Sequence, residues 1–159
     1  MFGNGGGEPS GGARSREVSP RDMAIQYLAR REYSRAELVS RLSAKGVDGD
    51  DIHRVLGDLA DEGLQSDARF AESFIRSRIS RGQGLIRIKG ELRQRGVDQE
   101  TQAAALAAVE EREAVDWFEL ARETLERRFS TPGDSPKERA KRERFLAARG
   151  FDFEQILLR

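Results

Sequence analysis

The chain has 159 residues, no cysteine, and equal numbers of basic and acidic residues, so its formal net charge at pH 7 is zero. The absence of cysteine excludes disulfides and thiolate metal sites and fits a reducing compartment. No apolar run approaches the roughly 20 residues that span a membrane, and the first twenty residues lack the apolar core of a signal peptide. We therefore expect a soluble, cytoplasmic protein.

Sequence patterns typical of helix N-termini occur at several points along the chain. Residues 1–18 are rich in Gly and Ser, and we expect them to form a flexible tail. Ser19 followed by Pro20 is the pattern of an N-cap with proline at the first helical position, and Ser135-Pro136 repeats it. Ser34 and Glu37 have the spacing of a capping box. These signals predict helices that begin near positions 20, 34 and 136.

One short sequence motif occurs three times, at intervals of about fifty residues. In each copy a leucine is followed four residues later by glycine, then by an apolar residue and aspartate. Glycine tolerates the left-handed conformation that ends a helix, and aspartate is a good N-cap for the next one. The motif therefore predicts a tight corner between two helices. The copies are Leu42-x-x-x-Gly46-Val47-Asp48, Leu92-x-x-x-Gly96-Val97-Asp98 and Leu146-x-x-x-Gly150-Phe151-Asp152.

A repeated corner at this period is typical of tandem helical modules, and we predict three three-helix repeats at 19–63, 64–110 and 111–159. The predicted helices are 20–32, 34–45 and 49–62, then 67–81, 85–95 and 99–110, then 112–129, 136–149 and 153–158. No helix breaker lies between Gln99 and Phe129, so whether the join there is one continuous helix stays open.

The expected core residues recur at helical spacing, as in the pairs Ile25 and Leu28, Phe70 and Phe74, and Trp117 and Leu120. No segment alternates with the period of two that indicates a strand. The fold class is therefore predicted to be all-α, and an array of such repeats offers an extended surface and no small-molecule pocket.

The neutral total hides an acidic segment followed by a basic one. Between Asp48 and Asp67 every charged residue except Arg54 is acidic, whereas between Arg76 and Arg95 every charged residue except Glu91 is basic. A helical stripe of cations without acidic partners fits an acidic protein groove or a nucleic-acid backbone. The candidate partner-binding residues are Arg76, Arg78, Arg81, Arg87, Lys89, Arg93 and Arg95, placed beside the expected core residues Ile86, Ile88 and Leu92.

Little in the sequence indicates catalysis. His53 is the only histidine and stands among acids, where a surface or capping role is the simpler interpretation. Gly82-Gln83-Gly84 is a fragment of a phosphate-binding loop without the Lys-Ser/Thr that such a loop requires. No carboxylate pair has the spacing for a metal or for acid–base work. We expect no catalytic residue, no metal and no cofactor.

The helix after each corner also argues against reading of the DNA major groove. Such a helix needs Arg, Lys, Asn or Gln for base edges and phosphates. Here it is acidic in the first repeat (Asp50, Asp51, Asp58) and rich in alanine in the second (103–105).

Three motifs in the right order resemble the RecX family of RecA regulators, over about residues 21–159. The first repeat contributes Tyr27-Leu28-Ala29-Arg30-Arg31-Glu32-Tyr33-Ser34-Arg35-x-Glu37-Leu38. The second contributes Ser66-Asp67-x-Arg69-Phe70-Ala71-Glu72-x-Phe74-Ile75, with Arg78, Gly82-x-Gly84 and Ile88-x-x-Glu91-Leu92-x-x-x-Gly96. The third contributes Arg144-Phe145-Leu146-x-x-Arg149-Gly150-Phe151.

This resemblance implies an elongated, curved array of three-helix repeats that binds along the groove of the RecA–single-stranded-DNA filament. It further implies inhibition of the ATPase, strand-exchange and co-protease activities of RecA, in recombination, DNA repair and the SOS response, by a protein that is not an enzyme. The expected partners are the RecA nucleoprotein filament and single- or double-stranded DNA, with no membrane partner, and the protein is expected to be a monomer. The alternative is a sequence-tolerant DNA-binding protein that competes with the recombinase for single strands.

Overall fold

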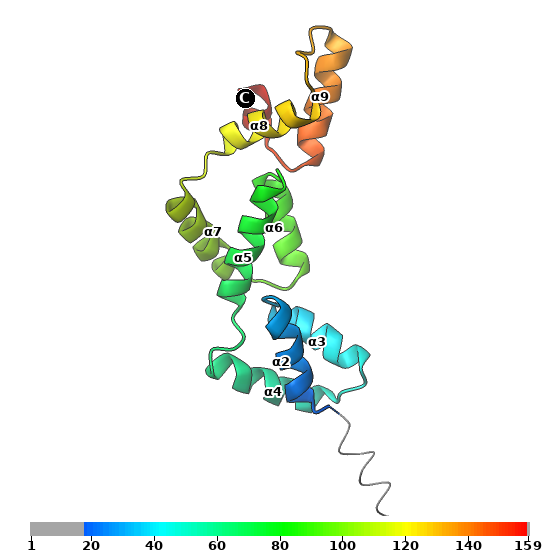
Figure 1. Ribbon diagram of the computed structural model, residues 1–159, viewed down its shortest axis with the longest axis vertical. Coiled ribbons are helices and arrows are strands. Elements are labelled where there is room, and N and C mark those ends of the chain that lie inside the picture. The colour runs from blue at the N-terminus through cyan, green and yellow to red at the C-terminus, as the bar shows by residue number, and fades with distance from the viewer. Residues whose placement is uncertain (1–17, 159) are drawn as a thin grey trace, which may run out of the picture. The chain divides into compact units, whose positions relative to one another are not determined.

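All regular structure in the computed structural model, which describes residues 18–158, is helical (Figure 1), and the prediction of an all-α fold is confirmed. The predicted tail, apart from Val18, lies outside these residues. The helices form three successive three-helix repeats. They are α2 (Pro20–Arg30), α3 (Arg35–Ala44), α4 (Gly49–Asp61), α5 (Asp67–Ser80), α6 (Leu85–Gln94), α7 (Gln99–Glu113), α8 (Trp117–Arg128), α9 (Pro136–Ala148) and α10 (Phe153–Leu157).

The chain divides into two compact units, one ending at Gln65 and the other beginning at Ser66. The first unit contains α2–α4, and the second contains α5–α10. The second unit therefore holds two of the three repeats, and the finer boundaries predicted at 63/64 and 110/111 stay predictions.

The three repeated corners adopt the predicted geometry. Gly46, Gly96 and Gly150 have φ angles of 85°, 78° and 98°, in the left-handed region that favours glycine. The amide after each glycine donates to the carbonyl of the leucine one turn back, at N–O distances of 3.1, 3.1 and 3.2 Å. Those leucines are at most 1% exposed. Each corner thus ends one helix, buries its leucine and positions the aspartate that caps the next helix.

The first unit has its own core around Leu38, Leu42 and Leu56, all fully buried. Tyr33 joins this core from the turn between α2 and α3, where Ser34 and Glu37 form the predicted capping box. Ile25 and Leu28 pack at the edge of the core and are only partly buried.

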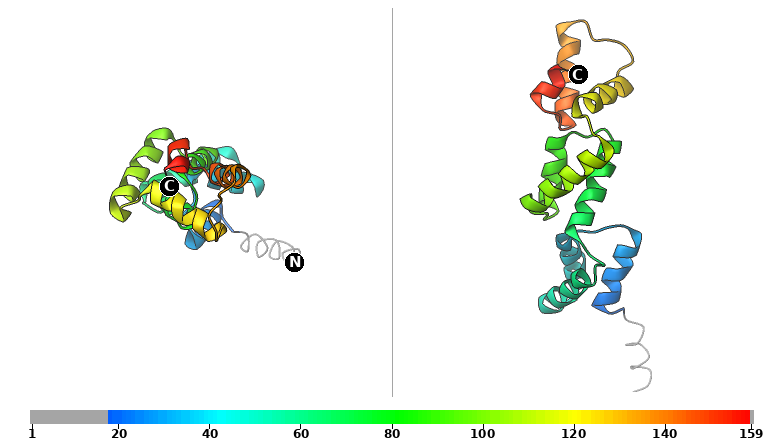
Figure 2. Two further views of the ribbon diagram at one scale, coloured as in Figure 1. Left: turned by 90° about the horizontal axis from the view of Figure 1, so that it is seen from above. Right: turned by 90° about the vertical axis from the view of Figure 1, so that its left-hand side faces the viewer.

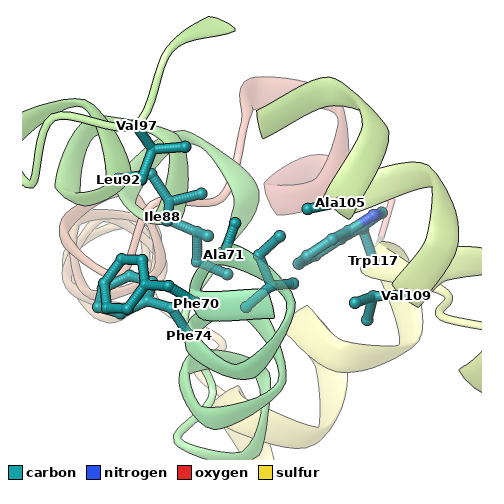
Figure 3. Packing of buried hydrophobic residues seen from close by; sticks show 10 residues of the cluster. Phe70, Ala71, Phe74, Ile88, Leu92, Val97, Ala105, Val109 and Trp117 are labelled. Carbon is teal, nitrogen blue, oxygen red and sulfur yellow. The ribbon is translucent and has the colours of Figure 1, made fainter. Parts of the chain in front are cut away.

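The core of the second repeat gathers side chains from α5, α6 and α7 and from the start of α8 (Figure 3). Phe70 and Phe74 lie side by side on α5, with ring centroids 5.6 Å apart. The indole of Trp117 lies against Ala105 and Val109, and its Nε1 donates to Glu110 at 2.7 Å. Trp117 therefore fastens α8 to the second repeat.

The chain is not one continuous helix between Gln99 and Phe129. Helix α7 ends at Glu113, and its C-cap Ala114 has a left-handed φ of 48° although it is not glycine. Asp116 then caps α8 by accepting from the amides of Phe118 and Glu119 at 3.0 and 3.1 Å. The N-cap and the buried Trp117 offset a backbone strain of about 1–2 kcal/mol at Ala114.

The second and third repeats are joined through backbone atoms. Gly84, the N-cap of α6, has no side chain to cap the helix. The corner between α9 and α10 replaces that cap, because the amides of Gly84 and Ile86 donate to the carbonyls of Arg149 and Gly150 at 2.7 and 3.0 Å. A Cβ on Gly84 would lie 2.5 Å from the carbonyl carbon of Gly150. Only glycine at position 84 permits this approach.

The corner geometry predicts opposite effects for two glycine substitutions. Gly96→Val places a β-branched residue in the left-handed region, and we expect it to lower the free energy of unfolding by about 1–3 kcal/mol. Gly90→Ala, inside α6 and with only the Arg93 side chain near the new Cβ, is expected to be neutral or stabilising. Urea unfolding followed by circular dichroism measures both, and equal stabilities would contradict the assigned corner.

The joint between the repeats predicts a local effect of Gly84→Ala. The new Cβ displaces the corner at Gly150, so the amide of Ile86 loses its acceptor and exchanges faster with solvent. We expect reduced hydrogen-exchange protection at 84–88 and 146–156. Gly57→Ala in α4, where nothing lies within 4 Å of the new Cβ, is the control and should leave protection intact. Unchanged exchange in Gly84→Ala would show that the backbone joint is absent in solution.

Candidate functional site

Helix α6 has one buried and one open side. Ile88 and Leu92, four residues apart, are 0% and 1% exposed and face the core. Ile86, Lys89 and Arg93 have the spacing i, i+3, i+7 of a second side of the helix, next to the buried one, and all three are exposed. The prediction that Ile86 lies in the core is wrong, since its exposed fraction is 59%. The open side of α6 therefore combines an isoleucine with two cations.

The seven predicted partner-binding cations do not lie on one face, because residues two apart on a helix point in nearly opposite directions. Arg76 approaches Glu72 and, on α7, Glu113, at 3.9 and 3.8 Å. Arg78 instead faces α6, where its Nε donates to Glu91 at 3.0 Å. Arg87 reaches the same Glu91 at 3.7 Å. The expectation that the basic stretch lacks acidic partners is therefore wrong for these three arginines.

Two of the seven cations are held against an aromatic ring. The guanidinium carbons of Arg78 and Arg95 lie 4.2 and 4.7 Å from the ring centroid of Phe74. The Arg78 side chain is only 14% exposed. Both arginines thus contribute to packing of the second repeat, which limits what they can offer a partner.

The cations that remain open are Arg81, Lys89 and Arg93. All three are exposed, and no ion pair joins them to a carboxylate of residues 18–158. Arg81 caps the end of α5, and its backbone carbonyl accepts from Arg149 at 3.2 Å. Lys89 and Arg93 stand one turn apart on α6. We call Lys89, Arg93 and Ile86 the α6 face.

A groove of about 440 Å³ runs between α6 and α7, beside the α6 face. Lys89 and Arg93 line one side of it, and the apolar part of its lining includes Leu106 and Ala107. Asp98 caps α7 at one end, where the hydrogen bond from the backbone of Thr101 lowers the pKa of its carboxyl group. Glu110 also lines the groove, so the groove can receive negative charge only on the side of Lys89 and Arg93, next to its apolar lining.

The residues that the sequence offered for catalysis or phosphate binding have structural roles. Nδ1 of His53 lies 2.9 Å from the guanidinium of Arg35 at the surface. Gly82 follows the C-cap of α5 with a φ of 75°, Gln83 is buried, and Gly84 lies against the backbone of Gly150. Gly82-Gln83-Gly84 is thus a packed turn. Within residues 18–158, no three His, Cys, Asp or Glu side chains are grouped to hold a metal ion.

Three family models match successive parts of the chain. They describe the first, second and third three-helix domains of RecX and match residues 21–59, 66–106 and 114–157. The chain belongs to the RecX family. The resemblance drawn from the three sequence motifs is thereby confirmed.

Relatives of high identity carry the name regulatory protein RecX. The protein from Chromohalobacter salexigens is 61% identical over 142 residues, covering 89% of this chain and 91% of the relative. That from Halorhodospira halophila is 46% identical and covers 91% of this chain and 87% of the relative.

Solved structures support the same fold. The crystal structure of RecX from Lactobacillus salivarius has a TM-score of 0.69 at 25% identity and covers 86% of this chain and 89% of its own. A second crystal structure of a regulatory protein RecX gives 0.71 at 22% identity and covers 86% and 68%. In residues 18–158, none of the helices combines the length and the apolar character that crossing a membrane requires.

The RecX fold of this chain thus separates structural cations from open ones, and substitution should reveal the difference. Arg78→Ala removes the bond to Glu91 and the packing on Phe74, so we expect unfolding to become easier by about 1–2 kcal/mol. Lys89→Ala should change stability by less than about 0.5 kcal/mol. Thermal and urea unfolding of the two variants tests this assignment, which a destabilised Lys89→Ala or a fully stable Arg78→Ala would contradict.

Proposed function

We propose that this protein is a non-enzymatic, cytoplasmic modulator of RecA that binds the RecA–single-stranded-DNA filament groove. In doing so it inhibits the ATPase, strand-exchange and co-protease activities of RecA and so regulates recombination and the SOS response. Its membership of the RecX family supports the proposal most strongly, since relatives up to 61% identical bear the name regulatory protein RecX. The protein is expected to act as a monomer.

The α6 face is the best-supported place for a contact with the filament among the predicted cations. Lys89 and Arg93 of this face are free to receive negative charge, as is Arg81 at the end of α5. In contrast, Arg76, Arg78 and Arg87 already have carboxylate partners. The groove beside Lys89 and Arg93 adds apolar surface. Its shape would make the contact more selective for one partner than charge alone could. A linked contact from each repeat would raise the affinity for a repeating filament through effective concentration.

Reversal of charge on the α6 face should weaken inhibition. With Lys89→Glu and Arg93→Glu together, we expect half-inhibition of RecA ATPase to need at least about ten times more protein, since two exposed ion pairs contribute about 1.4 kcal/mol. The matched control is Arg30→Glu with Lys45→Glu, which reverses two exposed cations of the first unit. Circular dichroism checks that both variants stay helical.

Three outcomes are distinguishable by co-sedimentation with preformed filament and by titration of naked single-stranded DNA. Filament binding that is stronger than naked-DNA binding, and is lost in the α6 variant alone, supports the proposal. Unchanged inhibition by the α6 variant contradicts the placement on α6. Equal affinity for naked DNA and filament would favour competition for single strands.

A further inference from the structure

A second basic surface lies on the third repeat, outside the basic stretch 76–95. Lys137, Lys141 and Arg144 have the spacing i, i+4, i+7 along α9 and therefore share one side of the helix. All three are exposed, and none forms an ion pair with a carboxylate in the part of the chain that the structure describes. We call these three residues the α9 face.

The acids of α9 lie beside this face. Glu143 precedes Arg144 by one residue and is turned about 100° away from it, whereas Glu138 precedes Lys141 by three residues and borders the face. With a rise of about 1.5 Å per residue, Lys137 and Arg144 stand roughly 10 Å apart along the helix axis. The α9 face is thus a continuous positive strip two turns long.

An aromatic pair supports the edge of this strip. Phe129, at the end of α8, and Phe145, on α9, form an edge-to-face contact with centroids 5.5 Å apart. The guanidinium carbon of Arg128 lies 4.9 Å from the first ring and 6.0 Å from the second. Lys141 approaches Phe129 at 5.9 Å, and Arg149 approaches Phe145 at 5.0 Å. Cations stacked on rings are held in place, and a guanidinium in this position still presents N–H donors at its edge.

The loop that joins α8 and α9 can be followed in Figure 2, and a buried arginine holds it in place. Arg142 is 8% exposed, and its Nη2 donates to the carbonyl of Thr131 at 2.7 Å. Its guanidinium also lies 4.4 Å from the ring of Phe129. This contact anchors the aromatic pair, so the α9 face and Arg128 are carried on a packed scaffold.

We propose that the α9 face, together with Arg128, binds the sugar–phosphate backbone of single-stranded DNA. Several spaced cations beside aromatic rings are typical of surfaces that bind single strands without sequence preference. This site goes beyond the proposed function, because it needs no RecA and lies on a different repeat from the α6 face.

The surroundings favour a nucleic acid over an acidic protein segment. A peptide would need an apolar recess beside the cations. The hollow of the third repeat, about 880 Å³, has apolar lining from Leu125, Phe129 and Leu157, but none of the three residues of the α9 face lines it. The α9 face itself offers charge with little apolar surface, which suits a phosphate backbone.

The test measures binding of a fluorescent thirty-nucleotide oligo-dT by anisotropy at several salt concentrations. Lys137→Gln, Lys141→Gln and Arg144→Gln together remove three phosphate contacts. The plot of log K against log salt should therefore become shallower by about 2, at roughly 0.7 per contact on a single strand. We also expect affinity at low salt to fall more than tenfold. The control is Lys45→Gln with Arg54→Gln and Arg127→Gln, which removes the same charge elsewhere and should keep the slope.

A charge-retaining variant and two competitors test whether the effect comes from lost charge and whether the ligand is single-stranded DNA. A charge-retaining variant, Lys141→Arg with Arg144→Lys, should bind with the wild-type slope, which separates lost charge from damaged folding. Poly-glutamate and a duplex of the same length serve as competitors, and single-stranded DNA should displace the probe best. An unchanged slope in the triple variant, or equal competition by poly-glutamate or by the duplex, would overturn the proposal.

The result is independent of inhibition of RecA. The α9 site is supported if the α6 variant loses filament binding but keeps the wild-type salt slope for oligo-dT. The α9 site is also supported if the triple α9 variant still inhibits RecA but binds oligo-dT with the shallower slope.

Discussion

The structure depends on one local constraint, the left-handed glycine that follows a buried leucine by four residues. At Gly46, Gly96 and Gly150 this conformation turns the chain back while the leucine carbonyl accepts a hydrogen bond from the amide beyond the glycine. No other residue adopts it without strain, so the glycine fixes where each helix ends. Because the next residues are an apolar side chain and a capping aspartate, the same corner also fixes what is buried and where the following helix begins.

The third corner does more than the other two. Its carbonyls at Arg149 and Gly150 accept from the amides at the start of α6, a helix whose N-cap is glycine and so provides no side-chain cap. A hydrogen bond that is usually local thus becomes a contact between repeats. This explains why the second and third repeats form one compact unit, and why close approach is needed at both Gly84 and Gly150.

Features that depend on neighbouring residues were predictable from the sequence. The corners, the N-caps at Ser19, Ser34 and Ser135 and most helix boundaries follow from short patterns, and the structure agrees with them within a few residues. The break at Ala114 was not predictable in this way, because no glycine or proline marks it. It follows from the capping of α8 by Asp116 and the burial of Trp117 in a core built by α5, α6 and α7.

The candidate site shows the same division between local and distant information. A count of charges along 76–95 finds a basic segment with one acid, yet that single Glu91 receives both Arg78 and Arg87, and Glu113 reaches Arg76 from α7. Sequence gives the number of charges, whereas folding decides which charges satisfy one another. Ile86 illustrates the converse, since the side chain expected in the core is open and lies on the α6 face. In a chain of zero net charge, the open cations are therefore those that remain after internal pairing, and in the second unit they include Lys89 and Arg93 on α6 and Lys137, Lys141 and Arg144 on α9.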